Sequence, residues 1–498
     1  MKFLKVKLWG KEIGRLVWDA NTRRTYFMYN PDNSADIPDV SPLLSPAATR
    51  NVLVPIFGDE HPIYQGLPPF IADSLPDSWG NTLFDRWVKD NKVPRNRVTP
   101  LYKLMFIGSR GMGALEYEPY ASDLVHSRAV DIKSLHEMSL KVLEERETVA
   151  LNENEEPTMQ TLLAVGTSAG GRQMKGIIAI NDKTGEIRSG QSDGLEGFEY
   201  YILKFGDKAM PTAEIEAAYH RMASLAGVEM EECRLFRAAG INHFLTKRFD
   251  RKNGKKLHMQ TLAAINPEAR SYEDLVATCR ELSIPESQIE QLFARLAFNV
   301  MANNTDDHNK NFSFLLEEGG RWHQSPAYDM TFTFNVTGTG PNIERRLSVG
   351  GKTSDITKTD LLDFARDNDI KGANATINRV ASAIKHFDEF ADACGIPQPW
   401  RGIVQKALND NLSSFGYLES RAPECTICSD KYGRTISHVT ISINAKGHYE
   451  VTAIINGQRQ RRFVKPNTAL HSILSQRDPI NGGTEDKIKV VEAVFAPE

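Results

Sequence analysis

The feature that most constrains this chain is a polar run that ends a helical pattern and precedes a predicted hairpin. Apolar residues repeat with a helical period over 289–300, so we expect a buried helix that ends just before Asp306. Asn311 follows in the same loop, and Asp329 lies beyond a segment that reads as two short strands and a tight turn. Such a hairpin would bring Asn311 and Asp329 face to face.

A carboxylate, an amide and a second carboxylate in this order suit phosphoryl transfer from a nucleotide. In such sites one Asp takes the proton of the attacking hydroxyl, while an Asn and another Asp hold magnesium against the phosphates. The pattern therefore indicates a kinase-type site, with Asp306 as the base and Asn311 and Asp329 as ligands of Mg²⁺.

Two other interpretations fit part of the same run. Segments rich in Asn and Asp often form only turns and caps after helices, and residues 304–307 fit that description. The second interpretation is a metal-dependent hydrolase, because carboxylate and imidazole groups are ordinary metal ligands. Its candidate ligands are Asp306, Asp307, His308 and His323.

Residues 304–311 read N-T-D-D-H-N-K-N, and Tyr328 stands directly before Asp329. This pattern resembles the HipA family of bacterial toxin Ser/Thr kinases, in which N-T-D-x-H-x-K-N is followed by Y-D. The resemblance implies that the chain uses ATP and Mg²⁺ and that the three site residues have the roles given above. It also places His308 and Lys310 in the ATP site, as structural or phosphate-facing residues.

A glycine-rich segment at 165–176 is a further candidate for phosphate contact. It begins like a Walker A loop, but Arg172 stands where that loop needs its lysine, so a P-loop NTPase is excluded. Glycine lets backbone N–H groups approach anionic oxygens, and we expect Gly170 and Gly171 to cover the phosphates, the alternative being an ordinary surface loop. In the HipA family this position carries S-x-x-G-x-Q-x-K, and the resemblance implies that Ser168 is autophosphorylated.

A predicted strand at 198–205 contains Lys204 within an apolar run, where a lysine usually needs a partner. It resembles the kinase strand lysine that contacts the α- and β-phosphates, a residue that a metal-dependent hydrolase would not need. Glu214 and Glu216 begin the helix predicted at 213–226, and either could pair with Lys204; the resemblance favours Glu216. The alternative is an acidic first helical turn that the helix dipole favours.

The strand predicted at 243–251 resembles the hinge of the HipA family, E-R-F-D-R, whose backbone groups meet adenine. Lys247 replaces the usual Glu of that pattern, and Phe249 keeps the aromatic position. The resemblance therefore places Lys247 and Phe249 beside the nucleotide.

The order of predicted elements indicates an α+β chain with a two-lobed, protein-kinase-like fold, in which a strand-rich N-lobe precedes a helical C-lobe. The expected domains are a HipA-like N-terminal subdomain at 1–125, a kinase N-lobe with the glycine-rich loop at 126–255, a helical C-lobe with the catalytic loop at 256–418, and an appended small β-rich domain of unknown role at 421–498. The strands expected in the last domain cover 436–443, 449–455, 460–464 and 488–495.

Bulk properties exclude several classes of protein. The formal net charge of −4 argues against a chain that coats nucleic acid by itself, and the basic group at 459–465 fits a solvated strand edge better than a nucleic-acid patch. No run of about eighteen apolar residues could cross a membrane. The five scattered cysteines suit reduced thiols, so we expect a cytoplasmic protein.

The resemblance also implies partners. Members of the HipA family act as the toxin of a toxin–antitoxin pair, so a DNA-binding antitoxin of the HipB type is expected, with DNA contacted only through it. The expected substrate is a protein, such as an aminoacyl-tRNA synthetase or another translation component. A non-catalytic corepressor that keeps the fold is the remaining alternative, and the complete set of Asp306, Asn311 and Asp329 argues against it.

Overall fold

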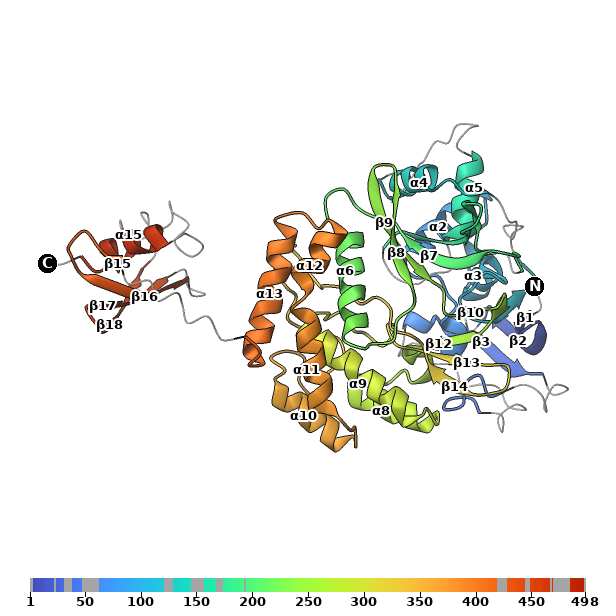
Figure 1. Cartoon of the computed structure of the whole chain (residues 1–498). Coiled ribbons are helices and arrows are strands. Elements are labelled where there is room, and N and C mark those ends of the chain that lie inside the picture. The colour runs from blue at the N-terminus through green and yellow to red at the C-terminus, as the bar shows by residue number, and fades with distance from the viewer. Residues whose placement is uncertain are drawn as a thin grey trace. The chain divides into compact units, whose positions relative to one another are not determined.

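The computed structural model describes residues 3–21, 24–30, 38–46, 62–120, 129–144, 156–166, 173–191, 194–418, 428–443, 448–465, 468 and 484–496 (Figure 1). The chain divides into two compact units, Met1–Asn411 and Leu412–Glu498. The division falls inside a helix, slightly before the boundary predicted at 418. The predicted subdivision of the first unit at 125 and 255 stays a prediction.

The first unit begins with a four-stranded antiparallel sheet in the order β3-β2-β1-β4. Its strands are β1 (Leu4–Leu8), β2 (Lys11–Asp19), β3 (Arg24–Tyr29) and β4 (Leu115–Glu118), and the helices that follow β3 are α1 (Pro69–Ala72), α2 (Ser78–Asp90) and α3 (Pro100–Ile107). Leu4, Val6 and Leu8 alternate toward the core, as a half-buried strand requires. The strands predicted at 2–9, 12–18 and 24–29 are confirmed.

A second, five-stranded sheet has the order β6-β5-β7-β9-β8. It is formed by β5 (Lys175–Asn181), β6 (Glu186–Ser189), β7 (Glu199–Lys204), β8 (Cys233–Ala238) and β9 (Ile241–Lys247), with helices α4 (Ile132–Glu144), α5 (Glu156–Val165) and α6 (Thr212–Leu225). Figure 1 shows α4 and α5 on one side of this sheet and α6 on the other. Helix α5 was not predicted; it begins inside the segment 152–157 that reads as a charged break.

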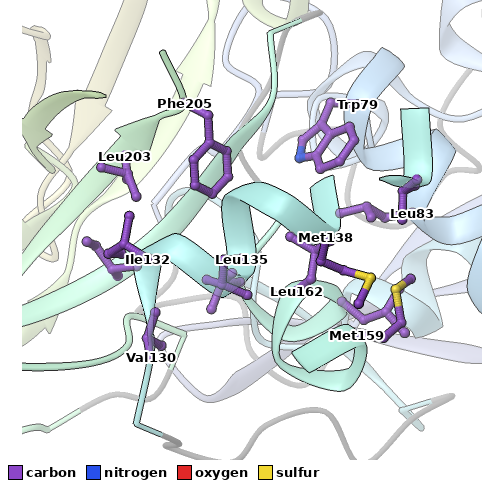
Figure 2. Close-up of a cluster of buried hydrophobic side chains, with 14 of the residues drawn as sticks. Trp79, Leu83, Val130, Ile132, Leu135, Met138, Met159, Leu162, Leu203 and Phe205 are labelled. Atoms are coloured by element: carbon purple, nitrogen blue, oxygen red, sulfur yellow. The ribbon is translucent and has the colours of Figure 1, made fainter. Parts of the chain in front are cut away.

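One buried cluster fixes which way the strands of this sheet face. Trp79 and Leu83 of α2, Leu162 of α5 and Leu203 of β7 belong to it, and Figure 2 shows these side chains together with those of α4. Successive side chains of a strand point to opposite faces, so Lys204 lies on the other face of the sheet, toward α6. Because the core cluster occupies one face of the sheet, Lys204 lies on the opposite face.

The helical half of the first unit contains a small sheet in the order β12-β13-β14. Its elements are β10 (Arg251–Lys252), β11 (Lys255–Lys256), β12 (His258–Thr261), α7 (Leu262–Ile265), α8 (Tyr272–Glu281), α9 (Glu286–Met301), β13 (Ser313–Leu316), β14 (Trp322–Gln324), α10 (Lys358–Asp367), α11 (Ala373–Ile384), α12 (Phe387–Cys394) and α13 (Trp400–Ser414). Helix α9 is buried from Leu292 to Met301, and the hairpin predicted after Asn311 is confirmed as β13 and β14. Helical periodicity over 373–388 predicts one helix, but this prediction is wrong in its extent, because α11 ends at Ile384 and α12 begins at Phe387.

In its described residues, the second unit has a four-stranded antiparallel sheet covered by a helix. Its elements are β15 (Cys428–Ser429), β16 (Thr435–Ile443), β17 (Tyr449–Ile455), β18 (Gln458–Val464) and α15 (Thr484–Val494). The strand predicted at 488–495 is wrong. Val490, Val491 and Val494 recur at helical spacing and pack on the sheet, so one apolar run that also fits a strand forms a helix face instead.

None of the helices in the described ranges is long and apolar enough to cross a membrane.

Candidate active site

The loop after α9 presents Asp306 at the surface. The N–H groups of Thr305 and Asp306 donate to the hydroxyl Oγ1 of Thr333, at 3.0 and 3.2 Å, which fixes the backbone of the loop. The side chain of Asp306 is 55% exposed, and its Oδ1 lies 3.5 Å from Nε of Arg346. A hydroxyl group from outside could therefore reach this carboxylate.

Its neighbour Asp307 has the opposite environment. The carboxylate is buried and accepts hydrogen bonds from Tyr272 Oη and Arg345 Nη1, both at 2.7 Å, and from the backbone N–H of Arg346 at 3.0 Å. Burial raises the pKa of Asp307, although Arg345 opposes that shift. Asp307 therefore anchors the loop and is not positioned to react.

These contacts argue against the hydrolase interpretation. With Asp307 bound to Arg345 and Tyr272, it is not positioned to bind a metal together with Asp306 and His308. Across the described part of the chain, no group of three or more His, Cys, Asp and Glu side chains could hold a metal ion.

Lys310 points toward the N-terminal part of the chain. Its Nζ donates to Oδ1 of Asp77 at 2.8 Å, and its backbone N–H donates to Nδ1 of His308 at 3.2 Å. Burial lowers the pKa of Lys310, but the Asp77 carboxylate outweighs burial and raises it. The prediction that His308 and Lys310 contact ATP therefore requires Lys310 to exchange Asp77 for phosphate.

Asn311 and Asp329 have the chemistry of magnesium ligands. Nδ2 of Asn311 donates to the backbone carbonyl of Asp306 at 2.8 Å, which leaves the amide oxygen as its metal-binding atom. Burial alone raises the pKa of Asp329, but Lys204 and Lys175 outweigh it and hold the pKa below its usual range. The carboxylate is thus ionised, as a hard, oxygen-bound cation requires, and these residues fit Mg²⁺.

Lys204 contacts two carboxylates on the face of the sheet opposite the core. Its Nζ lies 2.5 Å from Oε1 of Glu216 and also donates to Oδ1 of Asp329. Burial lowers the pKa of Lys204, but Asp329 and Glu216 outweigh burial and raise it. Glu214, the other candidate partner, instead accepts a hydrogen bond from Asn242 at 2.9 Å. The geometry therefore joins Lys204, Glu216 and Asp329.

A second buried lysine was missed as a site residue. Lys175 ends the S-x-x-G-x-Q-x-K pattern, and in the register of β5 and β7 it stands directly opposite Lys204, so both lie on one face. Lys175 is only 5% exposed, and burial lowers its pKa. The family pattern contained this residue, but only the strand pairing places it beside Lys204.

The predicted hinge presents Lys247 through its backbone. Its cross-strand partner is Tyr201, a member of the core cluster, so the Lys247 side chain lies on the face away from Lys204, where Nζ pairs with Glu199 at 2.8 Å. The backbone of Lys247 is therefore the part that could meet a nucleotide, and its place beside adenine stays a prediction. The ring centroids of Phe249 and Tyr328 lie 5.6 Å apart, and Tyr328 directly precedes Asp329.

Ser168, Gly170 and Gly171 lie outside the described residues. Residues on both sides of this segment lie against α2. A Cβ atom on Gly166 would lie 2.5 Å from Leu83, and Nε1 of Trp79 donates to the carbonyl of Lys175 at 2.9 Å.

Comparison with known proteins identifies the family. The model of the HipA N-terminal domain matches residues 4–118, and that of the HipA-like C-terminal domain matches residues 167–410. The chain belongs to the HipA family. The predicted family is therefore confirmed.

Two relatives add detail. HipA of Shewanella oneidensis MR-1, solved in complex with HipB and operator DNA, superposes with a TM-score of 0.60 at 16% identity, over 83% of this chain and 97% of that one. This likeness confirms the α+β, two-lobed, kinase-like fold. The chain is also 25% identical over 164 residues to "Putative kinase Y4mE" of Sinorhizobium fredii; the match spans 30% of this chain and only 39% of that protein.

The Asp77–Lys310 pair gives a first prediction. We expect Lys310→Met to lower kcat about ten- to hundredfold, because a displaced 304–311 loop would misplace the reacting groups. The free energy of unfolding should change by less than about 1 kcal/mol, since the side chains of Lys310 and Asp77 are 37% and 27% exposed. Asp77→Lys combined with Lys310→Asp should recover part of kcat in steady-state assays. Strictly additive losses in the double variant would contradict a functional link between the two residues.

Proposed function

We propose that this HipA-family protein is an ATP- and Mg²⁺-dependent protein Ser/Thr kinase. The observation that carries the proposal is the contact of Lys204 with both Glu216 and Asp329, next to the loop that exposes Asp306. A lysine held by a helix glutamate, a metal-binding Asp and a free carboxylate are the parts that phosphoryl transfer needs.

In the proposed reaction the Ser or Thr hydroxyl oxygen attacks the γ-phosphorus, the bond to the β,γ-bridging oxygen breaks, and ADP leaves. Asp306 accepts the hydroxyl proton, and Lys204 and Lys175 face the phosphates from the strands. Asn311 and Asp329 would hold Mg²⁺, which when bound neutralises charge on the phosphates. When phosphate and Mg²⁺ enter, Lys204 exchanges its contact with Asp329 for phosphate while it keeps Glu216.

Three further elements of the proposal rest on the family. Ser168 is proposed as an autophosphorylation site, since a phosphoserine adds roughly −1.5 to −2 charges and would repel the nucleotide from the glycine-rich segment. The partner is proposed to be a HipB-type antitoxin, because the similar Shewanella HipA is solved with HipB and operator DNA. The substrate is proposed to be a cytoplasmic protein, such as an aminoacyl-tRNA synthetase or another translation component.

The test compares the wild type with Asp306→Asn after incubation with γ-labelled ATP and Mg²⁺. We expect the wild type to label protein, and mass spectrometry to find phosphate on Ser168. We expect neither result in the variant, because no base remains to accept the hydroxyl proton. Equal ATP affinity of the two proteins by calorimetry is the control for folding. A wild type that binds ATP but transfers no phosphate would favour the corepressor interpretation.

A further inference from the structure

A hairpin at 333–343 runs from the Asp329 segment back to the catalytic loop; we name it the acceptor hairpin. The N–H of Asn342 donates to the carbonyl of Thr333 at 2.8 Å, and the N–H of Asn335 donates to the carbonyl of Gly340 at 2.9 Å. These bonds close a ladder around a short turn, so the acceptor hairpin has a defined shape.

Its base is fixed to the loop that carries Asp306. Besides the Thr333 hydroxyl contacts described above, Nδ2 of Asn342 donates to Oγ1 of Thr305 at 2.9 Å. Nδ2 of Asn303 donates to the backbone carbonyls of Thr333 and Asn342, at 3.3 and 3.2 Å. The acceptor hairpin and the proposed base therefore keep a fixed relation to each other.

One face of the acceptor hairpin packs against aromatic side chains. The ring of Phe334 lies 4.6 Å from that of Phe332 and 5.4 Å from that of Trp400, both in edge-to-face geometry. These contacts hold the base of the hairpin against α13, so that its outer side chains are presented on an anchored support.

Two large apolar side chains of the acceptor hairpin are exposed, as are the polar side chains of Thr337 and Thr339. Val336 is 106% exposed and Ile343 is 70% exposed, the two highest values for large apolar side chains among the described residues. Single exposed apolar residues are ordinary on a protein surface, but two on one anchored hairpin beside a reactive carboxylate indicate a binding surface.

We propose that Val336 and Ile343 form a docking surface for a polypeptide substrate that carries an apolar residue near its reactive Ser or Thr. This inference rests on the proposed function and adds where the polypeptide docks and which kind of flanking residue it carries. The acceptor hydroxyl must come within hydrogen-bond reach of Asp306, so whatever carries the hydroxyl must lie beside the acceptor hairpin. A small polar acceptor has no apolar surface to cover these two side chains, whereas a peptide chain does.

The test uses libraries of Ser and Thr peptides in which one position flanking the hydroxyl is varied at a time. We expect the wild type to prefer an apolar residue at one of these positions. Val336→Asp combined with Ile343→Asp should lower kcat/KM for the apolar peptides about tenfold or more, since the apolar contact area is lost. The same variant should gain a preference for Lys or Arg there, with ATP affinity unchanged.

The matched control is Leu225→Asp, which changes an exposed apolar residue at the far end of α6 and should alter neither preference nor rate. If the wild type phosphorylates peptides and the double variant keeps the wild-type preference, the docking surface is overturned and the kinase assignment stands. If the wild type phosphorylates no more than Asp306→Asn does, the proposed function fails and the docking surface fails with it.

Discussion

Replacing Asp329 by asparagine should abolish phosphoryl transfer and leave the fold intact. The carboxylate is the charged member of the proposed metal site, and loss of the several kcal/mol that a bound metal supplies corresponds to roughly a thousandfold lower rate. Asparagine is the substitution of choice because residue 329 has a φ of 53°, a conformation that Asn and Asp tolerate better than other residues. Alanine there would add backbone strain to the chemical change.

The measurements for this variant are transfer of label from ATP, binding of Mn²⁺ as a probe of the metal site, and circular dichroism. Glu318→Gln is the matched control, because it removes an exposed carboxylate from the turn between β13 and β14. A wild-type rate in Asp329→Asn would remove both the metal role and the kinase assignment. Unchanged Mn²⁺ binding with a lost rate would contradict the metal role alone.

Asp307→Asn should be the most destabilising single change at the site, by about 3–5 kcal/mol in urea unfolding. Arg345 and Asp307 are 4% and 0% exposed, so the amide would leave a buried guanidinium without its counter-charge. Catalysis should fall as well, because Asp307 holds the backbone of Arg346 and with it the loop beside Asp306.

Two controls separate this prediction from a general effect of charge removal. Asp363→Asn breaks an exposed pair with Arg366, in which the side chains of Asp363 and Arg366 are 45% and 68% exposed, and should leave the urea midpoint nearly unchanged. Asp307→Leu combined with Arg345→Met should be more stable than Asp307→Asn, since it leaves no buried charge. An Asp307→Asn variant with a wild-type urea midpoint would show that the buried pair does not stabilise the loop.

The N-terminal part of the first unit contributes to the site through α2 and the turn before it. Asp77 binds Lys310 of the catalytic loop, and Trp79 binds the backbone of Lys175. One short segment therefore contacts both the catalytic loop and the strand that follows the glycine-rich segment. We therefore expect substitutions in this segment to affect the proposed reaction without touching the nucleotide.

The sequence by itself determined the family, the first three strands, the buried helix before Asp306, and the hairpin that separates Asn311 from Asp329. These follow from local patterns: the period of apolar residues, the positions of turns and a motif of fixed spacing. The same kind of pattern was ambiguous at 488–495, where a short apolar run fits both a strand and a helix face, and packing on a sheet selected the helix.

Only the tertiary structure decided which charged groups meet. The residue pattern alone left Glu214 and Glu216 both open as partners of Lys204, with only the resemblance favouring Glu216. It named Asp306 as the base but did not show that Asp307 beside it is buried. The pairing of β5 with β7 put Lys175 beside Lys204, the register of β9 turned Lys247 away, and the position of α2 gave Lys310 its partner Asp77. The physical reason is that burial and electrostatic pairing depend on distances between segments far apart in the chain, which no local spacing encodes.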